Sequence, residues 1–154
     1  QAPDWPRWLG EVDDSWNNRL ASGLTWTGSN KLSLTLEGEY DGGAPGLDDW
    51  RRLARSPFYR LYRMQMATGG VLPARRAALA RASWQDALLD NLDLTAMRAA
   101  SLDDHSGMNW AEARYHLGPV DLALQWQRFD GGALSQYGAG LAKPSWQLVF
   151  DYFH

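Results

Sequence analysis

Ionisable side chains recur at every second position of several short segments. Glu37 and Glu39 form one such pair, and Glu112, Arg114 and His116 form a longer series. Alternate side chains of a β-strand point to the same face, so each series would present its charges together. Grouped this way, they can pair with one another or contact solutes by charge. The candidates for this polar face are Glu37, Glu39, Arg81, Glu112, Arg114, His116 and Asp121.

Residues 103–107 contain the other side chains that could take part in catalysis or metal binding. Asp103, Asp104 and His105 offer oxygen and nitrogen ligands, but no fourth spaced ligand accompanies them. Ser106 follows His105, yet the pair has no carboxylate placed to orient the histidine as a general base. The chain has no cysteine, which removes thiolate chemistry and disulfides. We therefore expect no catalytic residue, metal site or cofactor, and no enzyme.

Composition narrows the class of protein further. A net charge of −3 and a pI near 5.5 give no basic surplus for binding nucleic acid. The mean hydropathy is −0.46, and no apolar run approaches the length of a transmembrane helix. Barrel strands alternate polar and apolar residues, so these values are compatible with a membrane β-barrel. Nine tryptophans and six tyrosines suit a membrane interface or a carbohydrate site.

Seven segments show the two-residue alternation of a β-strand. The clearest internal one places Val120, Leu122, Leu124 and Trp126 on one face. Turn-forming Gly, Asn, Asp and Pro residues separate the segments, which favours an all-β antiparallel meander. In residues 72–89 the alanine-rich pattern also fits a helix. In the loop spanning residues 41–57, Asp48 and Asp49 are expected to cap a short helix that stops before Pro57. The predicted strands are residues 20–26, 32–40, 78–84, 92–102, 111–117, 120–127 and 146–154.

The chain ends on its most hydrophobic strand, in which Trp146, Leu148, Phe150 and Tyr152 alternate with other residues. This ending resembles the closing strand of Gram-negative outer-membrane β-barrels, although His154 stands where that family usually has Phe. The resemblance implies an up-and-down transmembrane barrel of porin-like type in the bacterial outer membrane, with the lipid bilayer as a partner. The apolar faces would contact lipid, and the polar face would line a lumen for small polar solutes.

Aromatic residues near the ends of the predicted strands fit the interfacial girdles of such a barrel. If the C-terminus is periplasmic, as the resemblance implies, the short turns fall on that side and the long loops outside. The expected girdle residues are Trp26, Tyr40, Trp84, Trp126, Trp146 and Tyr152.

The number of strands is either seven or eight. Residues 58–66 alternate well enough to form an eighth strand, which would allow a small closed barrel. Otherwise residues 15–154 are the C-terminal portion of a larger barrel, residues 1–14 are the end of a preceding loop, and another chain or segment completes the closure. An open edge in lipid would leave backbone groups unpaired, so closure is required.

Two other functions compete with a channel. A non-conducting scaffold would present residues 41–57 or 130–145 to a partner. A soluble lipocalin-like barrel would turn the sheet inside out, with the apolar stripes as its core and the charges in water. The charged faces opposite the leucines and tryptophans favour the membrane interpretation.

Overall fold

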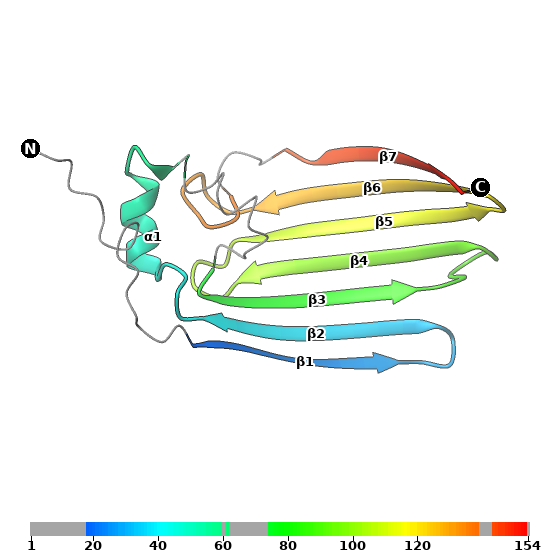
Figure 1. The fold of residues 1–154 in the computed structure, drawn as a ribbon, viewed down its shortest axis with the longest axis horizontal. Coiled ribbons are helices and arrows are strands. Elements are labelled where there is room, and N and C mark those ends of the chain that lie inside the picture. The colour runs from blue at the N-terminus through cyan, green and yellow to red at the C-terminus, as the bar shows by residue number, and fades with distance from the viewer. Residues whose placement is uncertain (1–17, 60, 62–73, 139–142, 154) are drawn as a thin grey trace, which may run out of the picture.

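Seven antiparallel strands form one sheet in the computed structural model, which describes residues 18–59, 61, 74–138 and 143–153 (Figure 1). The sheet follows chain order from β1 to β7, so each strand pairs with its sequence neighbours. One short helix, α1, lies between β2 and β3. The bounds are β1 Arg19–Thr27, β2 Leu32–Asp41, α1 Leu47–Ala54, β3 Arg76–Trp84, β4 Leu92–Ser101, β5 Gly107–Leu117, β6 Val120–Asp130 and β7 Ser145–Tyr152.

The predicted all-β antiparallel meander is confirmed, and the sheet is not closed. The connections β1–β2, β3–β4 and β5–β6, the last made by Gly118 and Pro119, lie at one end of the sheet, called the short-turn end below. The other three connections, which include the two longest, lie at the opposite end, called the loop end (Figure 1). Gly118 has a φ of 62°, the left-handed conformation that a two-residue hairpin favours and that glycine adopts most easily. In the alanine-rich segment for which a helix was considered, residues 76–84 form strand β3.

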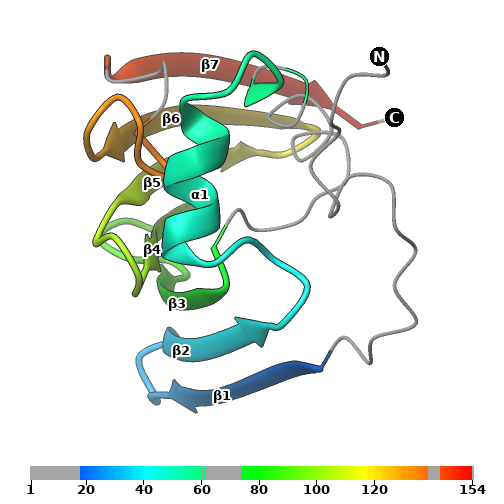
Figure 2. The same ribbon diagram turned by 90° about the vertical axis from the view of Figure 1, so that its left-hand side faces the viewer.

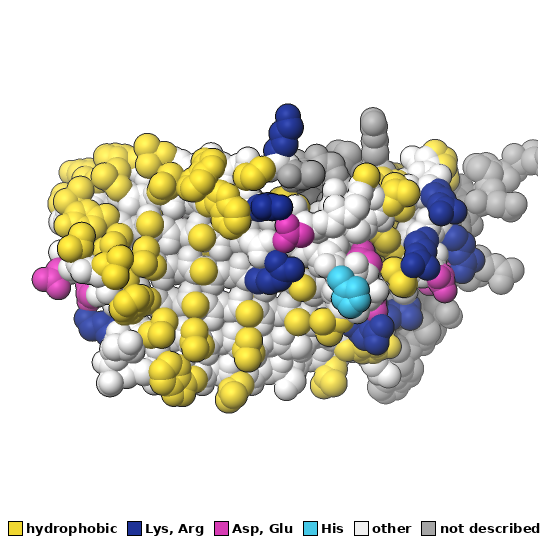
Figure 3. Space-filling model, turned by 180° about the vertical axis from the view of Figure 1, so that it is seen from behind, with side chains coloured by type: hydrophobic (Ala, Val, Ile, Leu, Met, Phe, Trp, Pro, Cys, Tyr) yellow, Lys and Arg dark blue, Asp and Glu magenta, His cyan; other side chains and the backbone are white. Residues whose placement is uncertain are grey.

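The continuous register gives the sheet two chemically different faces. One face, called the apolar face below, carries Leu24, Leu36, Leu124 and Leu148 in phase across the sheet. The opposite, polar face carries side chains such as Thr35, Glu112 and Gln125. Figure 3 views the apolar face, where hydrophobic side chains gather over the part nearest the short turns.

Figure 2 looks along the strands from the loop end and shows that they follow an open arc. The polar face lies on the inner side of this arc. Small residues there, such as Ala77, Ala99 and Ala123, are buried because neighbouring side chains converge on them. The apolar side chains stand on the outer side and remain exposed.

Helix α1 crosses the loop end of the sheet (Figures 1 and 2). Its buried side is made by Trp50, Leu53 and Ala54. The expected capping by Asp48 and Asp49 is wrong, because the N-cap residue is Gly46 and no side chain caps the helix. Both aspartates instead lie in the first turn, where a negative charge interacts favourably with the helix dipole.

The buried core of the described residues therefore lies at the loop end and on the inner face. Trp50 is packed edge-on against Tyr59, with ring centroids 5.9 Å apart. The proposed eighth strand is not formed where it is described, since Phe58 lies in a turn and Tyr59 and Leu61 are helical. The remainder of that segment, residues 60 and 62–66, and the N-terminal loop, residues 1–14, lie outside the described residues.

Candidate functional site

The sheet register places all seven candidate polar residues on the inner, polar face. Four of them come into contact near the short-turn end, and three remain apart from that cluster. The clustered residues come from β5 and β6, and the others come from β2 and β3. The contacting set is Glu112, Arg114, His116 and Asp121, and the separate set is Glu37, Glu39 and Arg81.

Arg114 is the centre of the cluster and links three strands. Its Nε lies 3.1 Å from Oε1 of Glu112, two residues away on the same strand. Its Nη1 lies 3.4 Å from Oδ2 of Asp121 on β6 and 3.0 Å from Oδ2 of Asp151 on β7. Gln125 also donates to Glu112 over 2.6 Å. One guanidinium group thus holds three carboxylates, which its fixed array of five N–H donors allows.

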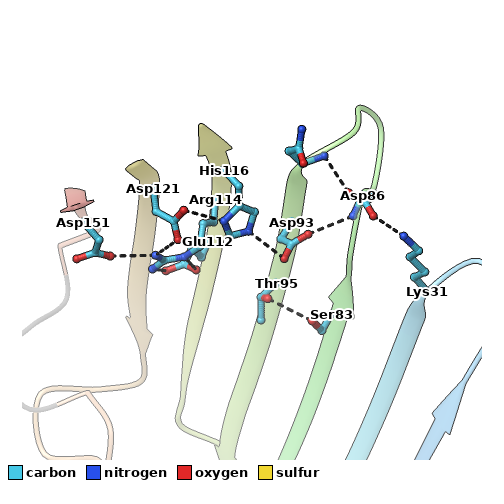
Figure 4. A network of polar contacts seen from close by, with 11 residues as sticks. Lys31, Ser83, Asp86, Asp93, Thr95, Glu112, Arg114, His116, Asp121 and Asp151 are labelled. Carbon is cyan, nitrogen blue, oxygen red and sulfur yellow. Dashed lines mark hydrogen bonds and ion pairs between the residues drawn. The ribbon is translucent and has the colours of Figure 1, made fainter. Parts of the chain in front are cut away.

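His116 extends the network toward β4. Its Nδ1 lies 2.8 Å from Oδ1 of Asp121, and its Nε2 lies 3.3 Å from Oδ2 of Asp93. The backbone amide of Asp86 donates to the other oxygen of Asp93, and Asp86 in turn accepts from Lys31. Figure 4 shows this continuous chain of polar contacts, from Asp151 on β7 to the turn between β1 and β2. These side-chain contacts connect neighbouring strands in addition to the backbone hydrogen bonds of the sheet.

The ion pair of Lys31 and Asp86 connects two short turns. The hydrogen bond to Asp86 raises the pKa of Lys31 above its ordinary value. The same bond, together with one from the backbone amide of Asn91, lowers the pKa of the Asp86 carboxyl. Both groups are solvent-exposed, so their contribution to stability is small.

Sequence reasoning missed four charged members of this network: Lys31, Asp86, Asp93 and Asp151. Asp93 and Asp151 alternate with the apolar residues of their strands, so their phase alone places them on the polar face. Lys31 and Asp86 had no such signal, because turn residues have no fixed phase relative to a strand.

The polar face carries an excess of negative charge. Glu37, Glu39 and Arg81 are exposed on β2 and β3. Among the described strand residues of this face, seven are carboxylates and three are arginines. The carboxylates are Glu37, Glu39, Asp41, Asp93, Glu112, Asp121 and Asp151, and the arginines are Arg19, Arg81 and Arg114. Cations are therefore attracted to this face and anions are repelled from it.

The loop residues considered for catalysis form a structural clamp. Ser106 is buried and donates its hydroxyl hydrogen to Oδ1 of Asp104 over 2.5 Å. Asp104 also accepts from the backbone amide of Gln136, 32 residues away, over 2.7 Å. Burial acts to raise the pKa of Asp104, but these hydrogen bonds outweigh it and lower the pKa below the ordinary value. The hydroxyl of Ser106 is thus oriented toward a carboxylate that positions two loops.

All six aromatic residues expected at membrane interfaces lie on the apolar face. Trp26, Trp84 and Tyr152 stand close to the short-turn end, and Tyr40 and Trp146 stand close to the loop end. Trp126 differs, because β6 continues to Asp130 and leaves this tryptophan inside the strand. Its ring lies 6.4 Å from that of Trp146 on the neighbouring strand.

Comparison with known proteins found no matching family model, no similar curated protein and no similar solved structure. No described helix has the length and apolar character needed to span a membrane. Within the described part of the chain, no three His, Cys, Asp or Glu side chains are grouped as metal ligands.

Proposed function

We propose that this chain forms part of a bacterial outer-membrane β-barrel that passes small polar solutes through a charged lumen. One observation carries the proposal: apolar side chains stand exposed on the outer face of the arc, while most of the charged side chains of the strands lie on its inner face. The resemblance of the last strand to closing strands of outer-membrane barrels supports the same interpretation.

The exposed area is large for a protein surface in water. Leu24 is 73% exposed, Leu148 is 75% exposed and Phe150 is 64% exposed, and all lie on the same face. Contiguous apolar patches of this kind mark contact with lipid or with another protein. Contact with hydrocarbon removes the cost of hydrating these side chains, since each Å² of apolar surface taken out of water contributes about 25 cal/mol.

Two features of the inner face support its proposed role as a solute path. Its charges are held at fixed positions by the Arg114 and His116 contacts, and Glu37, Glu39 and Arg81 remain exposed. Because carboxylates outnumber arginines on it, we propose that cations pass in preference to anions. The proposed mechanism has no catalytic step and uses no cofactor.

Closure requires further strands. β1 and β7 run in the same direction, since both go from the loop end to the short-turn end (Figure 1). Direct pairing of these two edges would be parallel, and a second copy that paired antiparallel along either edge would be inverted, with its loops on the opposite side. An all-antiparallel barrel therefore needs an odd number of additional strands from another segment or chain. This requirement favours the C-terminal part of a larger barrel.

A planar-bilayer recording of the assembled protein tests the proposal. In a salt gradient we expect ion-conducting steps and a reversal potential that indicates cation preference. Replacing two exposed inner carboxylates, in E37Q/E39Q, should shift the reversal potential toward zero. The matched control D48N/D49N removes the same charge from α1 and should leave the potential close to that of the parent. Absence of conductance in protein that has inserted would contradict the channel.

A scaffold is the second candidate, because the described parts of the two loops expected to contact a partner are joined to each other. Trp50 of α1 donates to the carbonyl of Leu134 in the loop between β6 and β7, over 2.9 Å. Inserted protein that conducts nothing, but loses a copurifying partner when residues 131–138 are deleted, would favour this function over the channel. The lipocalin-like alternative is disfavoured by the exposure of Leu122, Leu124 and Phe150, which would form its core.

A further inference from the structure

A row of polar side chains interrupts the apolar face of β4, β5 and β6. Arg98 pairs in register with Asn109, and Asn109 pairs with Arg128, so the three side chains lie side by side on the outer face. The sequence places Arg98 in phase with the apolar stripe. The register of β4 is continuous, without a bulge that would turn Arg98 to the inner face. The guanidinium groups therefore stand on the surface proposed to contact lipid.

The row has a defined internal geometry. Nη1 of Arg98 lies 2.7 Å from Oδ1 of Asn109 and 3.1 Å from Oδ2 of Asp130. Nε of Arg128 lies 3.3 Å from the other oxygen of Asp130, and Asn109 donates to Asp130 over 2.6 Å. A single carboxylate thus orients two guanidinium groups, leaving a net positive charge. The two arginine side chains remain 50% and 55% exposed.

The position of the row fits the edge of a bilayer. Arginine is strongly disfavoured at the midplane of a membrane, and this cost nearly vanishes at the interface. Trp126 precedes Arg128 by two residues on the same face and packs against Trp146, and tryptophan rings concentrate at headgroup level. A hydrocarbon boundary that crosses β6 at Trp126 would explain why this residue lies inside the strand, because β6 would continue past the boundary.

We propose that Arg98 and Arg128 bind the phosphate group of an anionic lipid in the leaflet on the loop side. This inference rests on the proposed membrane-spanning barrel. Each guanidinium uses only part of its set of five N–H donors for Asn109 and Asp130, so donors remain for phosphate oxygens. Guanidinium groups bind phosphate through paired hydrogen bonds, and the net positive charge of the row complements an anionic headgroup. The neighbouring apolar side chains would contact the acyl chains of the same lipid.

Tryptophan quenching in vesicles tests this site. The assembled protein is placed in phosphatidylcholine vesicles that contain a minor fraction of brominated phosphatidylglycerol, or the same fraction of brominated phosphatidylcholine. The W126F variant identifies the part of the quenching that comes from Trp126. A favourable contact of about 1 kcal/mol per basic residue near an anionic surface corresponds to about fivefold enrichment. We expect enrichment of that order for phosphatidylglycerol beside Trp126.

Three variants assign the effect to the row. R98Q/R128Q should bring quenching by the two brominated lipids to the same level. R98K/R128K keeps the charge without the paired hydrogen bonds and should show an intermediate preference. This variant also tests the site if R98Q/R128Q does not fold. R19Q/R81Q removes the same charge from the polar face and should retain the parent's lipid preference.

The outcomes separate this inference from the proposed function. Parent protein that does not insert into either vesicle contradicts the barrel, and the lipid site with it. Parent protein that inserts and conducts, but shows equal quenching by both lipids, overturns the lipid site alone. So does a preference that persists in R98Q/R128Q, or one that is lost equally in R19Q/R81Q.

Discussion

Trp50 of α1 donates its indole hydrogen to the carbonyl oxygen of Leu134, with 2.9 Å between nitrogen and oxygen. The two residues are 84 positions apart, and their bond joins the helix to the loop between β6 and β7. The ring itself is only 1% exposed. At the loop end of the sheet, a buried side chain therefore joins two long connections.

Replacement of Trp50 should loosen this end without unfolding the sheet. W50F removes only the hydrogen bond, which contributes about 1 kcal/mol, whereas W50A also leaves a cavity and costs about 3–5 kcal/mol. Hydrogen exchange measured on residues 131–138 should accelerate slightly in W50F and strongly in W50A. Exchange in β4 and β5 should change little, because the backbone ladder does not involve Trp50. W146F, a change on the exposed apolar face, is the control, and unchanged exchange in W50A would contradict the assigned role.

Acid should release the clamp formed by Asp104. Its hydrogen bonds lower the pKa in the folded state, so its contribution to stability is present above about pH 4 and is lost as the pH falls through the folded pKa. The amide resonances of Gln136 and Tyr137, followed by NMR, should shift with a midpoint below the ordinary aspartate value. This step should be absent in D104N and retained in D48N, which changes an exposed helix carboxylate. A midpoint above the ordinary value would contradict the clamp.

Two glycines of the apolar face should respond oppositely to alanine. A Cβ at Gly107 would lie 2.7 Å from the backbone oxygen of Ala99, closer than a carbon atom tolerates. At Gly38 it would meet nothing within 4 Å. We expect G107A to destabilise the sheet by about 1–3 kcal/mol through overpacking. G38A should be neutral or slightly stabilising, because glycine weakens a strand. Urea unfolding of the inserted protein measures both, and equal midpoints would show that β4 and β5 do not approach as described.

The alternation of apolar and polar residues was enough to predict the sheet. The strand pattern of residues 120–127 corresponds to β6, and Asp121 and Glu112 lie on the predicted face. The extension of β6 to Asp130 was missed because Arg128 and Asp130 interrupt its apolar stripe, and a polar residue in phase ends the pattern that predicts a strand.

Contacts between distant loops could not be predicted. The bond between Asp104 and the amide of Gln136 depends on where two loops meet, and neither loop has a periodic pattern that fixes its side chains. The Lys31–Asp86 pair is similar, since it forms only after β2 and β3 are in register. The helix was predicted with Asp48 and Asp49 as its cap, but the N-cap residue is Gly46 and both aspartates lie in the first turn.

The central claim is that the apolar face touches hydrocarbon, and spin-label accessibility measures this most directly. The chain contains no cysteine, so single cysteines can be introduced without a background. Neighbouring positions on three strands give matched pairs for labels in liposomes: L36C with E37C, L124C with Q125C, and L148C with Q147C. The account predicts that each leucine position collides more with oxygen, and each polar position more with a water-soluble nickel chelate. The reverse order on these strands, or no difference within the pairs, would contradict it.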